Sequence, residues 1–279
     1  MKKVYDLAFS LGFSCGGTDA LRNAGLQFAS YPLDWIGAPS VLASAGMIVR
    51  RFDGWLQKED LELFDVRYGK MNRRVFRNRR TGYGFPHDFP VGSTLEEAYP
   101  EVARKYARRI DRFLQEFSAA KRVLMIYIDR PINARAADAE LVEARRILAE
   151  AYPQAEIDLI YFYVDGSEGG FRETPVASGV TAVACDNREY MGEEISHEVA
   201  YRKIAGYLGG VAEVIDRRSE AERTAYSEKH AENKRARFTA GGSFWTAKLA
   251  KIEYRLYRRL ERRLIAAGVL PPERPLWFY

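Results

Sequence analysis

Cysteine and histidine are scarce in this chain of 279 residues, which contains two cysteines and three histidines. Two cysteines cannot form the disulfide framework of a small secreted domain, and no cysteine or histidine pair has zinc-ligand spacing. The sequence also lacks a run of about 18 uncharged apolar residues, so no transmembrane helix is expected. Its start, Met1-Lys2-Lys3, leads into a short strand with Asp6 and makes a poor signal peptide. We expect a cytoplasmic protein, and peripheral attachment to the inner membrane stays open.

Nucleotide-binding motifs are absent as well. The glycines between Gly12 and Gly17 have the wrong spacing for a Walker loop or a dinucleotide fingerprint. We therefore expect no cofactor and no metal. The net charge of +5 is mild, but positive charge gathers in residues 67–80 and 244–264. Such clusters favour an anionic partner, and without a known recognition motif they do not predict a specific nucleic acid.

Strand-like and helical segments alternate along the first three quarters of the chain. Apolar runs of strand length end at Gly12 or occupy residues 123–128, 157–164 and 180–184, and helical patterns occupy about 98–118, 135–151 and 194–209. Near-continuous apolar strands are covered on both faces, and alternation with helices favours a parallel sheet. The predicted fold class is α/β, a three-layer sandwich with a mostly parallel sheet.

Two segments depart from this rhythm. Residues 62–80 alternate across a Gly-Lys-Met-Asn turn, which predicts a β-hairpin insertion in an α/β domain of residues 1–212. Residues 213–279 form a charged helical linker followed by an amphipathic helix at about 244–267. That helix is predicted to dock on protein, within the chain or in a homodimer, rather than on a membrane.

Cys15 lies at the predicted junction between the first strand and a helix capped by Thr18 or Asp19. A thiol there is near the positive end of the helix, which favours the thiolate and so a nucleophile. Backbone groups around it would contact a substrate; they belong to Gly12, Phe13, Ser14, Gly16 and Gly17. The alternative is a small buried cysteine in a tight turn.

Three segments resemble a known family. The run Ser10-Leu11-Gly12-Phe13-Ser14-Cys15, the run 20–26 and the run Ala29-Ser30-Tyr31-Pro32-Leu33-Asp34-Trp35 are similar to S-L-G-x-x-C, L-x-x-x-G-L and S-x-P-F-D-W. These motifs belong to a bacterial domain family of unknown function, described as papain-like cysteine peptidases. Here Leu33 replaces the usual phenylalanine. The segment Phe85-Pro86-His87-Asp88-Phe89, which we expect to be a loop, resembles the family's second block. The resemblance implies that His87 is the base for Cys15.

The family resemblance and the periodicity disagree about the fold. Papain-like enzymes place the cysteine helix against an antiparallel sheet, whereas this sequence predicts a parallel one. We follow the periodicity for the fold and the resemblance for the cysteine chemistry.

A cysteine–histidine pair also needs an acid that orients the histidine. Asp88 is adjacent to His87, but neighbours on an extended segment point in opposite directions. Asp129 follows a strand, would reach the same sheet edge and is the other candidate. Asp34 and Trp35 are predicted either to line the pocket or to act as helix cap and core. Arg73 and Arg74 would hold an anionic group of the substrate.

His197 is a second candidate for the catalytic base. Glu194 stands three residues before it, as in the last block of SGNH/GDSL esterases, to which this segment is similar. In that arrangement Glu194 and His197 would serve Cys15 or Ser14. The Gly-Asp-Ser pattern of that superfamily is absent.

Three functions are therefore under consideration. The first is a cysteine hydrolase or acyl transferase of amidase, peptidase or thioesterase type, acting on an anionic small molecule, peptide or glycan. The second is an SGNH-like esterase or acetyl-ester hydrolase that uses Glu194 and His197. The third is a non-catalytic domain that binds an anionic glycan or a nucleotide precursor.

Overall fold

A computed structural model describes residues 2–13, 15–67, 72–129, 135–165, 170–185, 197–226 and 228; for residues 197–202 it describes the backbone alone. The chain divides into two compact units, residues 1–217 and 218–279. The predicted helix at 244–267, Ser14 and Glu194 lie outside the described residues.

The first unit is built on a mostly parallel sheet, as predicted. Its order is β2 (Leu7–Ser10), β6 (Arg122–Ile128), β7 (Glu156–Val164), β9 (Val180–Cys185) and β8 (Arg172–Ala177). Only β8 runs antiparallel to its neighbour among these strands. A short strand β1 (Lys3–Tyr5) precedes β2 and pairs in parallel with β10 (Ala212–Val214).

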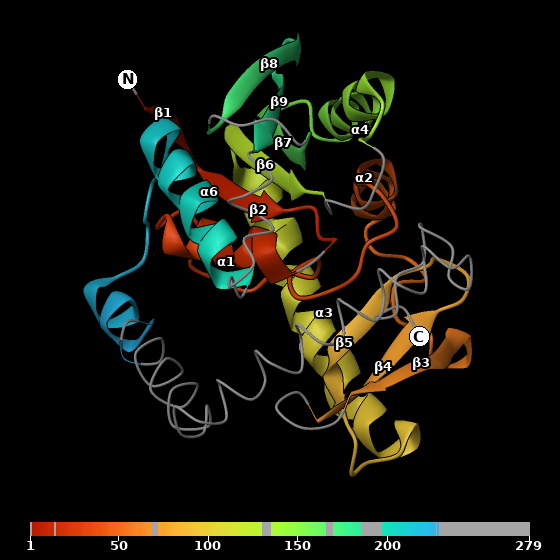
Figure 1. The fold of residues 1–279 in the computed structure, drawn as a ribbon. Coiled ribbons are helices and arrows are strands. Elements are labelled where there is room, and N and C mark those ends of the chain that lie inside the picture. The colour runs from red at the N-terminus through yellow and green to blue at the C-terminus, as the bar shows by residue number, and fades with distance from the viewer. Residues whose placement is uncertain are drawn as a thin grey trace, which may run out of the picture. The chain divides into compact units, whose positions relative to one another are not determined.

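Helices cover both faces of this sheet (Figure 1). The helices α2 (Val41–Val49), α3 (Leu95–Ala119) and α4 (Asp138–Ala151) share one core cluster with Phe9 and Met125. On the other face, α1 (Cys15–Asn23) and α6 (His197–Val211) share a second cluster with Ala8 and Leu124. Because successive strand residues point to opposite faces, one apolar run supplies both cores. The predicted three layers are confirmed.

An antiparallel sheet is inserted between α2 and α3. After the 3₁₀ turn η1 (Lys58–Asp60) come β3 (Leu61–Arg67), β4 (Arg73–Asn78) and β5 (Gly84–Pro90), in that order. The predicted hairpin corresponds to β3 and β4. The prediction of a loop around His87 is wrong, because this residue lies in the third strand. Pro86 and an irregular register hide β5 from a search for alternating residues.

Among the described residues, none of the helices combines the length and the apolar character needed to cross a membrane.

Candidate functional site

Cys15 is the first residue of α1 rather than a residue of the preceding turn. The turn contains two successive residues with left-handed backbone, Gly12 at φ 91° and Phe13 at φ 79°. Phenylalanine rarely adopts such a φ, so the turn is strained at the position where strand passes into helix. The thiol of Cys15 is half-buried. Its place in the first turn of α1 favours the thiolate, because the helix end carries partial positive charge.

The predicted helix cap at Thr18 or Asp19 is wrong, because α1 begins three residues before Thr18. Thr18 is fully buried and its hydroxyl donates to Asp34 Oδ1 at 2.8 Å. The two glycines that follow Cys15 suggest a turn, yet they form the first helical turn. Gly17 is required by packing, since a Cβ there would lie 2.2 Å from Ser10 Oγ.

Asp34 is the buried polar centre of the segment that follows α1. Its side chain is inaccessible to solvent and accepts hydrogen bonds from three donors. They are Thr18 Oγ1 at 2.8 Å, Gln27 Nε2 at 2.7 Å and the Tyr31 amide at 2.8 Å. Burial raises the pKa of Asp34 above its ordinary value, although the Tyr31 amide, the Arg22 guanidinium and the Thr18 hydroxyl oppose the shift. Asp34 does not cap the next helix, because Ser40 Oγ accepts from Ala43 N at the start of α2.

Trp35 connects this segment to the inserted sheet. Its backbone is left-handed, with φ 66°, and its half-buried ring meets the ring of His87 edge to face at 6.2 Å between centroids. The guanidinium of Arg22, from α1, lies 5.3 Å from the centroid of the Trp35 ring. The indole therefore stands between a cation of α1 and the candidate base on β5.

His87 lies in an irregular part of β5. In the register with β4, Phe85 faces Phe76 and Phe89 faces Arg74. Three residues of β5, Pro86 to Asp88, therefore face the single residue between those two on β4. Bulges of this kind re-aim side chains and occur beside active sites. Arg73 Nε donates to the carbonyl oxygen of His87 at 3.1 Å and holds the bulge from the β4 side.

Asp88 points away toward α3. Its carboxylate forms an ion pair with Lys105 and accepts from the hydroxyl of Tyr106 at 2.9 Å, and 5% of its side chain is exposed. Lys105 and Tyr106 were not among the predicted site residues. Nothing in the sequence around Lys105 and Tyr106 indicates that these residues contact β5.

Asp129 follows β6 at the carboxyl edge of the parallel sheet. It is 6% exposed and accepts a hydrogen bond from the hydroxyl of Tyr161 on β7. Since Ser10 pairs with Ile126, the loop after β2 and the residue Asp129 leave the sheet at the same edge. Phe13 of that loop packs on Tyr127 at 5.9 Å between ring centroids. The turn before Cys15 and the end of β6 are thus neighbours.

Two further parts of the predicted site are Arg74 and the pair His197 and Glu194. Arg74 is half-buried on β4, next to Arg73. The backbone of His197 begins α6, after the last strand of the parallel run. The structure says nothing of the His197 side chain or of its predicted partner Glu194. Within the described residues, no cluster of His, Cys, Asp or Glu has the makeup of a metal site.

A hollow of about 270 Å³ lies elsewhere, at the opposite edge of the sheet. Its lining includes Ser118, just before β6, and Gln154, just before β7. Cys15 and Asp129 follow the carboxyl ends of β2 and β6, so this hollow is not part of the site.

Comparison with known proteins identifies a matching protein family. A family model with the description "Putative papain-like cysteine peptidase" matches residues 6–151, more than half of the chain. The chain is also similar to an uncharacterized protein, R408, of Acanthamoeba polyphaga mimivirus, with 32% identity over 135 residues. That match covers 43% of this chain and 60% of the viral protein. No solved structure matches. The matched region ends with α4 and includes Cys15, Asp34, His87 and Asp129.

Proposed function

The chain belongs to the family described as papain-like cysteine peptidases, and from that membership we propose that it is a cysteine hydrolase with Cys15 as nucleophile and His87 as base. The observation that carries the proposal is the position of Cys15. It opens α1 after a strained turn at the carboxyl edge of a parallel sheet, where α/β proteins place their chemistry. The bulge in β5 supports the role of His87, because it lies where the imidazole meets Trp35, and the segment of Trp35 contacts Gly12 and Thr18 on either side of Cys15.

The proposed reaction is acyl transfer through a thioester. The Cys15 thiolate attacks a carbonyl carbon of the substrate, and backbone amides at the start of α1 stabilise the oxyanion. The imidazolium of His87 gives its proton to the leaving group as the carbonyl re-forms. His87 then removes a proton from water, whose oxygen attacks the thioester. The C–S bond breaks, the acid product leaves, and the Cys15 thiolate and the protonated His87 are restored.

We propose Asp129, rather than Asp88, as the acid that orients His87. The described partners of the Asp88 carboxylate are Lys105 and Tyr106, both on α3. Asp129 lies at the sheet edge that also carries the turn before Cys15. The esterase arrangement with Glu194 and His197 remains the alternative.

An anionic substrate is part of this proposal. Arg73 lies against the backbone of His87, and Arg22 lies over the Trp35 ring that His87 contacts. The Arg73 guanidinium beside the candidate base and the Arg22 guanidinium beside Trp35 would attract a small molecule, peptide or glycan that carries a carboxylate or phosphate.

The thiol can be tested by alkylation of the full chain with iodoacetamide. Cys15 should react at neutral pH about tenfold faster than an ordinary half-buried thiol, because only the thiolate reacts. Cys185, which is 5% exposed at the end of β9, serves as the internal comparison. Peptide mass spectrometry follows both sites in one sample. Equal, slow labelling of the two thiols would contradict the nucleophile and favour the non-catalytic binding domain.

The base can be tested with the same reaction. His87→Ala should slow alkylation of Cys15 and flatten its dependence on pH, because the thiolate loses its cationic partner. His197→Ala is the matched control and should leave the rate unchanged. The reverse pattern would reject His87 and favour the esterase-like arrangement.

A further inference from the structure

The segment of residues 31–38 contacts both sides of Cys15 and also the strand of His87. Before Cys15, a Cβ at Gly12 would lie 3.1 Å from Ile36 Cδ1 and 3.2 Å from Ala38 Cβ, so the turn and this segment are in close contact. After Cys15, Thr18 donates to Asp34 one helical turn along α1. The segment therefore holds the two flanks of the thiol.

The same segment is bonded to β5. Gly37 and Gly84 exchange two backbone hydrogen bonds, each of 2.8 Å, which form an isolated antiparallel bridge. Three residues further along β5, the ring of His87 meets the ring of Trp35. One short segment thus contacts the helix that begins with the thiol and the strand that bears the imidazole.

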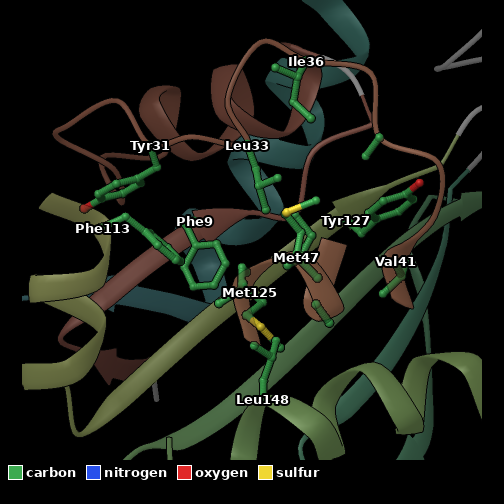
Figure 2. Packing of buried hydrophobic residues seen from close by; sticks show 14 of the residues in the cluster. Phe9, Tyr31, Leu33, Ile36, Val41, Met47, Phe113, Met125, Tyr127 and Leu148 are labelled. Atoms are coloured by element: carbon green, nitrogen blue, oxygen red, sulfur yellow. The ribbon is translucent and has the colours of Figure 1, made fainter. Parts of the chain in front are cut away.

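This segment is itself fixed in the core. Tyr31, Leu33 and Ile36 are at most 4% exposed, and Figure 2 shows them among the side chains of the larger core cluster. Tyr31 packs on Phe113 of α3 at 5.6 Å between ring centroids. The hydrogen bond from Thr18 to Asp34 holds the segment against α1. A segment buried in this way can transmit a displacement at one end to its other end, because packed cores yield little.

We propose that residues 31–38 form a strut that sets the position of His87 relative to Cys15, and that Asp34 and Trp35 are positioning residues of this site. This inference rests on the proposed function for its catalytic meaning, but the coupling it asserts can be measured without catalysis. Asp34 acts through Thr18 and α1, and Trp35 acts through the ring of His87. Misplacing a reacting group by about 1 Å can reduce a rate by roughly 100-fold, which makes such a strut consequential.

The test uses the full chain labelled with ¹³C at the histidine Cε1 position. Three histidines give three signals, and His87→Gln assigns the relevant one. Thr18→Val removes the hydroxyl that donates to Asp34. The described hydrogen bond of the Thr18 side chain does not involve β5. The strut predicts that Thr18→Val shifts the His87 signal and slows alkylation of Cys15 by about tenfold. Thr18→Ser keeps the hydroxyl and should restore both.

A second variant tests the other end of the strut. Trp35→Leu should slow alkylation and make the further change His87→Ala ineffective, since the imidazole is no longer held in place. Trp35→Phe keeps an aromatic edge and should retain most of the rate and most of the effect of His87→Ala. Thr174→Val, at an exposed position of β8, is the matched control for an unspecific response. Circular dichroism establishes that each variant is folded.

The outcomes separate the two proposals. If Thr18→Val shifts the His87 signal while His87→Ala leaves alkylation unchanged, the strut stands and the cysteine–histidine function falls. If His87→Ala slows alkylation while folded Thr18→Val alters neither readout, the function stands and the strut is rejected.

Discussion

Asp34 is a buried carboxyl group whose surroundings both oppose and support its charge. Burial disfavours the ionised form, while hydrogen bonds from Thr18 and the Tyr31 amide favour it. The net effect raises the pKa of Asp34 above 3.8, so the folded protein binds this proton more tightly than the unfolded chain. The contribution of Asp34 to stability is therefore largest below the unfolded pKa and declines as the pH rises through the folded pKa.

This sign can be checked with Asp34→Asn, which fixes the side chain in a neutral form. We expect the stability of the wild type, relative to the variant, to fall as the pH rises from about 4 toward neutrality. Urea denaturation of both proteins at several pH values measures this difference. If the wild type instead gains relative stability with rising pH, hydrogen bonding to the carboxylate outweighs burial, and folding lowers the pKa of Asp34 rather than raising it.

At the scale of elements, α1 packs closely against β2, because Gly17 of α1 has no side chain where it meets Ser10 of β2. Ser10 Oγ accepts from the Gly12 amide at 3.1 Å, and Gly17 of α1 lies directly against that serine. A Cβ at position 17 would be 3.0 Å from Ser10 Cβ as well. The strand, the strained turn and the cysteine helix thus form one packed unit.

Gly17→Ala should destabilise the protein by about 1–3 kcal/mol, since the added methyl group forces α1 away from β2. Chemical denaturation measures the loss. The double variant with Ser10→Gly should recover part of it, because the two positions touch. Gly206→Ala in α6 is the control; with open space around its Cβ, it should gain about 0.5–1 kcal/mol. An unchanged stability for Gly17→Ala would contradict the close contact.

The elements differ in how far the sequence predicts them. Long periodic segments such as α3 and the apolar strand β7 follow from local pattern, because burial of one or both faces dictates their composition. The strands β5 and β8 were missed, because each contains proline and an irregular register. Cys15 and His87 could be named from motifs. The role of Thr18, Lys105 and Tyr106 could not, since it arises from contacts between distant segments.

At the scale of the whole molecule, the chain divides into a first unit of residues 1–217 and a second unit of residues 218–279. The expected domain boundary at about residue 212 stays a prediction. The amphipathic stripe predicted at 244–267, its docking on protein and a homodimer through it all remain predictions.

Removal of residues 240–279 tests that docking. We expect a lower melting temperature or lower solubility, because an apolar stripe that packs on protein stabilises what it covers. Differential scanning fluorimetry and sedimentation compare the full and the shortened chain. A shortened chain that is equally stable and soluble, but no longer binds vesicles of anionic phospholipid, would instead support a membrane-surface helix.

The pairing of β1 with β10 has a consequence for biosynthesis. Lys3 pairs with Ala212, and the Asp6 carboxylate accepts a hydrogen bond from Arg217 at 2.6 Å, across 211 positions of the chain. The strand β1 therefore lacks its partner β10 until almost the whole first unit has been translated. Contacts between such distant positions form slowly, since a long loop must close first. The nascent chain is thus expected to leave the ribosome with β1 still without its partner strand, and to form this pair only after Val214 has emerged.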